Sequence, residues 1–180
     1  MSKFSTFDDF NPVLGAEKTL EAFRDIAFNE VAPPLLLVYG TTGNGKTHLC
    51  EATARELLKR GIECRLWVVA DLVSKLKESI PKDTTELLMT SMKTVPALIL
   101  DEWGQNYGSD WEVQKLEEIV IARERAGLIT VVTSNLEPDK LAVKAERAVN
   151  RFRDRAEARC IVNKAVSYRP KKKARRQKGD

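Results

Sequence analysis

One stretch near the start of the chain, residues 35–48, constrains the fold more than any other. Its sequence is LLLVYGTTGNGKTH. A short apolar run over residues 35–39 is followed by glycines, a lysine and a threonine in the spacing G-x-x-x-x-G-K-T, which begins at Gly40 and ends at Thr47. The apolar run predicts a buried strand, and the residues after the loop have the pattern of a helix. This strand–loop–helix context is the one in which the motif binds a nucleotide.

The chemistry of the loop explains its composition. A polyphosphate needs many converging backbone N–H donors, and a glycine-rich turn lets the backbone approach that closely. The helix after the loop directs its N-terminal amides and positive dipole end toward the phosphates. Lys46 is expected to reach the β- and γ-phosphates of ATP, and the Thr47 hydroxyl to bind Mg²⁺. For His48, packing is the alternative to nucleotide contact. The candidate nucleotide-binding residues are Gly40, Thr41, Thr42, Gly43, Asn44, Gly45, Lys46, Thr47 and His48.

A second chemical centre is the sequence ALILDE at residues 97–102. Four apolar residues predict a buried strand that ends on two acids, Asp101 and Glu102. At the carboxyl end of a parallel strand, these side chains would face the crevice beside the glycine-rich loop. Asp101 suits a direct or water-mediated Mg²⁺ contact, and Glu102 suits the polarisation of an attacking water molecule.

Strands alternate with helices along the whole chain. The expected strands are residues 35–39, 62–69, 97–102, 128–135 and 160–166, and the expected helices are 16–29, 46–60, 71–79, 84–93, 109–126 and 138–155. We take Asp71 as the N-cap of the third helix. This order predicts an α/β fold with a five-stranded parallel sheet flanked by helices. The aromatic lead-in at residues 4–12 either lies beside an adenine ring or only covers the core.

Composition bounds the remaining alternatives. The chain has 180 residues, of which 43% are hydrophobic and 31% charged, as in a soluble single domain. No apolar run approaches the roughly 20 residues that span a bilayer, and the first residues lack a signal core. We therefore expect a cytoplasmic protein with reduced cysteines. The last twelve residues hold seven lysines and arginines against one aspartate, whereas the whole chain has a net charge of +4. This basic tail, residues 169–180, is either a solvated disordered segment or a non-specific nucleic-acid contact, and the two are compatible.

The chain resembles the AAA+ ATPase domain of bacterial and phage helicase loaders of the DnaC type, with the transposition helper IstB as close kin. The resemblance covers residues 4–169, so it reaches the first residue of the basic tail, and we expect residues 1–168 to form the AAA+ ATPase domain. It is carried by four motifs: GTTGNGKTHL, LILDEW, TSNL and ERAVNRFR. The family implies an AAA+ P-loop NTPase fold without a lid domain. It also implies that Lys46 and Thr47 are Walker A residues and that Asp101 and Glu102 are Walker B residues.

The same resemblance implies further roles. Asn135 is similar to sensor 1, on the strand between the two Walker strands. Arg151 matches the arginine finger, which acts on the ATP of a neighbouring subunit and so implies a head-to-tail homo-oligomer. The helices of residues 71–93 resemble an insertion that lines a path for single-stranded DNA, with Lys75 and Lys77 as candidate contacts. Arg169 occupies a tail position shared by the family.

The function that follows is that of an ATP-hydrolysing helicase loader, stimulated by assembly or DNA and partnered with single-stranded DNA and a replicative helicase. Full loaders carry an N-terminal domain that grips the helicase, yet the first expected strand here begins at Leu35. We therefore expect that this domain is missing or that another surface binds the helicase. One alternative is an IstB-like transposition helper. Another is a small-molecule kinase, which needs an acceptor pocket and usually an arginine-bearing lid, and no such lid is evident.

Overall fold

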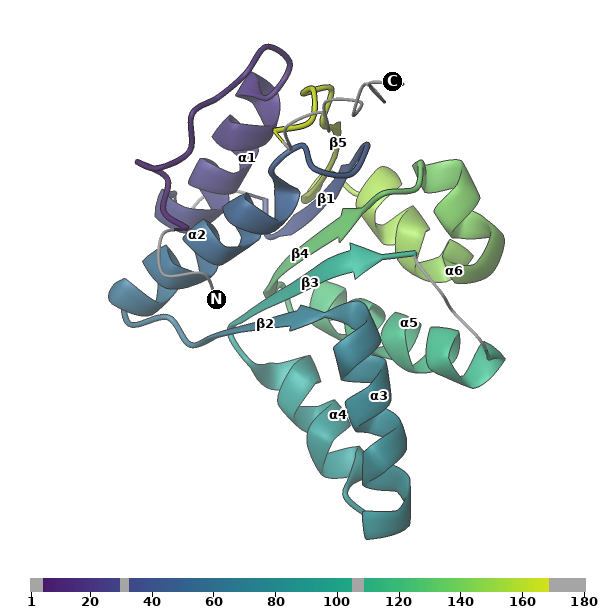
Figure 1. Cartoon of the computed structure of the whole chain (residues 1–180). Helices are drawn as coiled ribbons and strands as arrows, with labels where there is room; N and C mark the ends of the chain where they lie inside the picture. Colours follow the sequence, from purple (N-terminus) through teal and green to yellow (C-terminus); the bar gives the residue numbers. More distant parts are fainter. Residues whose placement is uncertain (1–4, 30–32, 105–108, 169–180) are drawn as a thin grey trace, which may run out of the picture.

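The computed structural model describes residues 5–29, 33–104 and 109–168. Within these ranges, five parallel strands form one sheet in the order β2-β3-β4-β1-β5, which confirms the predicted fold class (Figure 1). The basic tail at residues 169–180, including Arg169, lies outside the described residues. The strands are β1 (Leu35–Tyr39), β2 (Cys64–Val68), β3 (Ala97–Trp103), β4 (Ile129–Ser134) and β5 (Ala158–Val162).

Helices cover both faces of the sheet, so the fold has three layers (Figure 1). On one face lie α1 (Glu17–Phe28) and α2 (Lys46–Lys59); on the other lie α5 (Asp110–Arg125) and α6 (Pro138–Arg153). Alternate strand residues point to opposite faces: Leu36 packs toward α1 and α2, whereas Leu35 and Leu37 pack toward α5 and α6. Both faces are therefore buried, as expected for a parallel sheet. No helix in the described part of the chain has the length and hydrophobicity needed to cross a membrane.

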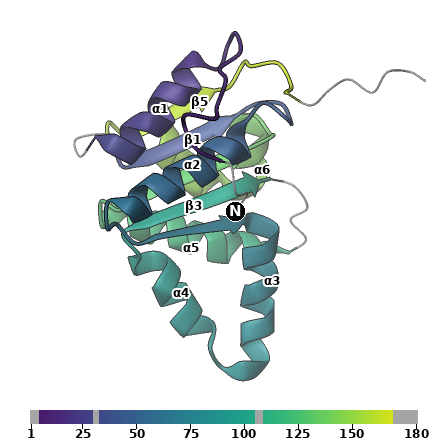
Figure 2. The same ribbon diagram turned by 60° about the vertical axis from the view of Figure 1, so that its left-hand side comes forward.

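A helical hairpin projects beyond the β2 edge of the sheet (Figures 1 and 2). It consists of α3 (Val69–Ser79), the 3₁₀ turn η1 (Ile80–Lys82) and α4 (Thr85–Thr94). The prediction of Asp71 as the N-cap is wrong. The helix begins at Val69, directly after β2, and Asp71 lies in its first turn. There the negative charge of Asp71 interacts favourably with the helix dipole, but its side chain does not cap a free amide.

Arg123 anchors this hairpin to the sheet. Its side chain is fully buried, and Nη1 donates hydrogen bonds to the carbonyls of Met92 (2.8 Å) and Val95 (2.7 Å) at the end of α4. Nη2 donates to the Ile129 carbonyl (2.7 Å) at the start of β4. Burial lowers the Arg123 pKa from its usual value to about 10, because desolvation disfavours the charged form. One guanidinium thus fixes the end of α4 against the sheet.

Candidate functional site

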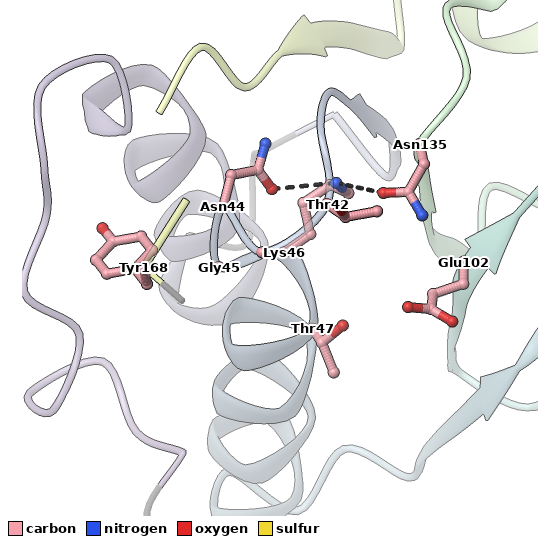
Figure 3. Close-up of a pocket in the computed structure, with 9 residues that line it drawn as sticks. Thr42, Asn44, Gly45, Lys46, Thr47, Glu102, Asn135 and Tyr168 are labelled. Atoms are coloured by element: carbon pink, nitrogen blue, oxygen red, sulfur yellow. Dashed lines mark hydrogen bonds between the residues drawn. The ribbon is translucent and has the colours of Figure 1, made fainter. Parts of the chain in front are cut away.

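An open pocket of about 350 Å³ lies at the carboxyl ends of β1, β3 and β4 (Figure 3). Because β4 lies between β1 and β3, the residue that follows it is placed between the glycine-rich loop and the two acids. This is the crevice position at which parallel sheets bind ligands. The pocket is lined by Thr42, Gly43, Asn44, Gly45, Lys46, Thr47, Glu102, Asn135 and Tyr168.

The ammonium group of Lys46 is the centre of the polar network. The residue is only 5% exposed, and burial lowers its pKa from 10.5 to about 8, although nearby acids oppose this shift. The three N–H groups of the ammonium are shared among four oxygen atoms. Three of these belong to the glycine-rich loop, and the fourth belongs to the residue that follows β4. These belong to the carbonyls of Gly40 (2.7 Å) and Thr41 (2.9 Å) and to the side chains of Asn135 (2.9 Å) and Asn44 (3.1 Å).

At two positions, both the backbone conformation and the surrounding atoms require glycine in the loop. Gly40 has φ +146° and Gly45 has φ +90°, a region that side chains other than glycine's rarely adopt. A Cβ atom at Gly40 would collide with the carbonyl oxygen of Asn163, and one at Gly45 would lie 2.6 Å from the Phe10 ring. The loop therefore packs tightly on its outer side, while its inner side opens into the pocket.

Thr133 on β4 holds both acids of β3. Its hydroxyl donates a hydrogen bond to Oδ1 of Asp101 and accepts one from the backbone N–H of Glu102 (3.0 Å). The pairing register of β3 with β4 shifts between Leu100 and Trp103, and Glu102 has φ +61° in this bulge. Bulges and left-handed residues re-aim side chains at functional sites. Here the bulge leaves Asp101 buried and Glu102 exposed in the pocket.

The residues fit a magnesium ion. Asp101 is 1% exposed, and its Oδ2 atom is buried with no hydrogen-bond partner among the described residues. Burying a carboxylate oxygen without a partner costs folding free energy, unless a bound ligand or metal ion interacts with it. The Thr47 side chain lines the pocket as well (Figure 3). Mg²⁺ is usually held by one or two such oxygens together with substrate phosphates.

His48 and the aromatic lead-in lie behind the loop. The His48 Nε2 atom is 2.8 Å from the Thr6 carbonyl oxygen, and its ring centroid is 5.4 Å from that of Phe10. Phe10 is 6% exposed and packs in the core. These contacts favour the packing alternative for His48 and for the described part of the lead-in, since neither lines the pocket.

Arg151 lies far from the pocket of its own chain. Helix α6 leads from the end of β4 back to the start of β5, so its last turn, which contains Arg151, lies toward the amino ends of the strands. There Nη1 of Arg151 is 3.9 Å from the Glu124 carboxylate, which also pairs with Arg155 (3.2 Å). The Nε atom of Arg151 is buried and has no hydrogen-bond partner in the described part of the chain.

Lys75 and Lys77 lie on α3, and both side chains are more than half exposed. Lys77 forms an ion pair with the buried Glu112 of α5, whereas Lys75 is 3.5 Å from the exposed Glu78. Lys75 also lines a groove between α3 and α4. The structure therefore places neither lysine in the nucleotide-binding pocket, and it leaves Lys75 the less constrained of the two.

Two pocket residues were not anticipated from the sequence. Tyr168 lines the pocket, and Asn163 supports it: Asn163 and Asn44 each donate a side-chain hydrogen bond to the other's backbone carbonyl (3.0 and 3.2 Å). Both residues follow β5, near the other end of the chain from the loop. The sequence shows an aromatic residue directly before Arg169, which by itself indicates no contact partner.

The sheet order, the glycine-rich loop, the paired acids and the polar residue between them define an AAA+ P-loop domain. A family model described as IstB-like ATP binding protein matches residues 3–175, and the chain belongs to this family. The replicative helicase loader DnaI of Bacillus subtilis is 33% identical over 107 residues, which are 59% of this chain and 34% of that protein. DnaC of Escherichia coli K12, also a replicative helicase loader, is 31% identical over 117 residues, 63% of this chain and 48% of that protein. The chain thus matches less than half the length of these two relatives, and the resemblance to DnaC-type loaders is confirmed.

Solved structures agree on the fold. A crystal structure of DnaI superposes with a TM-score of 0.75 at 29% identity, covering 90% of this chain and 94% of that one. The DnaC helicase loader gives a TM-score of 0.76 at 23% identity, with coverages of 89% and 97%. The replication initiator DnaA bound to AMPPCP and single-stranded DNA gives 0.82 at 23% identity, with coverages of 90% and 50%.

Proposed function

We propose that this domain binds ATP with Mg²⁺ and hydrolyses it. The observation that carries the proposal is the convergence of Lys46, the unsatisfied Asp101, Glu102 and Asn135 at one edge of the sheet. On binding, the ammonium of Lys46 exchanges its loop carbonyl acceptors for phosphate oxygens. The amides at the start of α2 donate to the same phosphates.

The roles of the remaining side chains follow from their positions. Asp101 and Thr47 would hold Mg²⁺, and the ion would supply neutralisation of the phosphate charge. Glu102 accepts a hydrogen bond from the attacking water and polarises it. Figure 3 shows the Asn135 amide with its oxygen toward Lys46 and its nitrogen on the side of Glu102, so Asn135 can orient that water.

We further propose that Arg151 completes the site of a neighbouring subunit. Its place at the opposite end of the sheet excludes contact with the nucleotide of its own chain, and a head-to-tail assembly brings the two ends together. An arginine that enters an ATP site in trans stabilises the charge that develops during phosphoryl transfer.

The proposed biological role is that of a cytoplasmic helicase loader that binds single-stranded DNA and acts on a replicative helicase. It is supported by the names of the relatives DnaI and DnaC and by the likeness to DnaA bound to AMPPCP and single-stranded DNA. The projecting α3–α4 hairpin is the candidate DNA-binding element. Of its two candidate lysines, Lys75 is more available to phosphate than Lys77, which is paired with Glu112. The test is phosphate release from ATP with and without single-stranded DNA; we expect stimulation, and an unresponsive protein contradicts the DNA role.

A transposition helper is the second candidate, because the matching family model carries the description IstB-like ATP binding protein. The ATP chemistry is the same in both candidates, so only the partner distinguishes them. Affinity purification of the tagged chain from its native cells tests this. Recovery of a replicative helicase supports the loader, and recovery of a transposase in its place supports the helper.

A further inference from the structure

Tyr168 forms the end of the pocket opposite the acids. Figure 3 shows its ring on one side of the glycine-rich loop and Glu102 and Asn135 on the other. In the proposed function, the γ-phosphate lies beside Glu102, where water attacks. The nucleoside end of an extended ATP molecule therefore points away from the acids, toward the side of the loop on which Tyr168 lies.

The position of the Tyr168 ring is fixed by contacts with two distant segments. Its backbone N–H donates to the Gly43 carbonyl (2.8 Å). Its hydroxyl donates to the Asn11 carbonyl (2.8 Å) and accepts from the N–H of Val13 (3.0 Å). The Phe10 ring supports it at a centroid distance of 5.5 Å. The hydroxyl is therefore already engaged, while the residue remains 39% exposed.

We propose that Tyr168 is the residue that recognises the nucleoside end of ATP, and that it does so through its aromatic ring rather than its hydroxyl. The inference rests on the proposed function. A preorganised ring contacts a purine base with little loss of conformational freedom, and the contact tolerates either purine because every base has an aromatic face. Tyr168 thus contributes to affinity for a nucleotide over a bare polyphosphate.

The test compares two ligands, ATP and inorganic tripolyphosphate, each titrated with Mg²⁺ into the full chain by calorimetry. Tyr168→Ala is expected to weaken ATP binding by about tenfold or more and to leave tripolyphosphate binding within about twofold of wild type. Tyr168→Phe should recover most of the lost ATP affinity, because it restores the ring. Phe28→Ala removes another exposed aromatic ring outside the pocket and serves as the control.

Two results for Tyr168→Ala overturn the inference without affecting the proposed function. One is equal weakening of both ligands, which shows an effect on the loop, and the other is no weakening of either. A Tyr168→Phe variant that binds ATP as poorly as Tyr168→Ala shows that the hydroxyl matters, and it also overturns the inference. A wild-type chain that binds neither ligand overturns the proposed function and the inference with it.

Discussion

The Nζ atom of Lys46 lies 2.9 Å from Oδ1 of Asn135, so the first residue of α2 is hydrogen-bonded to the residue that follows β4. This bond joins the phosphate-binding loop to the strand that lies beside the two acids. A ligand that draws Lys46 toward its phosphates therefore also changes the environment of Asn135. In the proposed function, these two residues directly connect nucleotide binding with the position at which water would be activated.

The low pKa of Lys46, about 8, predicts a pH-dependent affinity for ATP. Phosphates favour the charged ammonium, so the pKa of Lys46 is higher in the complex than in the free protein. Below pH 8 the affinity is constant; above it the affinity falls, by up to about tenfold per pH unit, because binding must then add a proton. Calorimetry between pH 7 and 9.5 measures this. Lys46→Arg keeps its charge throughout and should not show the slope; a flat wild-type profile contradicts the assignment.

Glu102→Gln is expected to bind ATP as wild type does and to hydrolyse it about 100-fold more slowly or worse. The amide keeps the size of the side chain but no longer polarises water. Steady-state phosphate release and ATP affinity are measured on the same sample. The exposed Glu146 of α6 offers a matched control, Glu146→Gln. Unchanged turnover in Glu102→Gln rejects the role of this carboxylate.

Arg151→Ala is expected to bind ATP normally and to lose assembly-dependent hydrolysis by about 10³-fold. Arg153→Ala, on the same helical turn, is the control. A mixing experiment makes the test sharper. A subunit with Arg151→Ala retains an intact Glu102, and a Glu102→Gln subunit retains an intact Arg151. If the arginine acts in trans, mixing the two inactive variants restores turnover; loss of ATP binding in Arg151→Ala places the residue in its own subunit's site instead.

Asn163→Ala should reduce the free energy of unfolding by about 1–3 kcal/mol, because it removes the side-chain donor to the Asn44 carbonyl and the side-chain acceptor of the Ala165 N–H. It should also weaken ATP binding, since Asn44 accepts a hydrogen bond from Lys46. Urea unfolding measures the first effect, with Asn150→Ala at an exposed position of α6 as the control. Stability equal to that of the control would show that the hydrogen bonds of the Asn163 side chain contribute little.

Much of the fold was predictable because its signals are local. The strand Leu35–Tyr39 and the start of α2 at Lys46 lie where the sequence places them. The capping box that begins α5, formed by Ser109 and Glu112, is likewise a short-range pattern. In contrast, β2 is shorter than expected, because helical geometry begins at Val69 before any breaking residue.

What could not be predicted depends on contacts between distant residues. Asn163 reaches Asn44 across 119 positions of the chain, and no periodic pattern encodes that pairing. The ion pair of Lys77 with Glu112 is of the same kind, and it makes Lys77 a weaker DNA candidate than its exposure suggests. The left-handed conformation of Glu102 depends on the bulge between β3 and β4, which an apolar run ending in two acids does not reveal.

The most direct test of the central claim is a calorimetric titration of ATP with Mg²⁺ into wild type, Lys46→Ala and the exposed control Lys59→Ala. The structure predicts saturable binding of one ATP per chain in wild type and in Lys59→Ala. In Lys46→Ala, loss of the charged hydrogen bonds to phosphate should weaken binding by about tenfold or more. A correctly folded wild-type chain that binds no ATP, or a Lys46→Ala variant that binds it as well as wild type, contradicts the account.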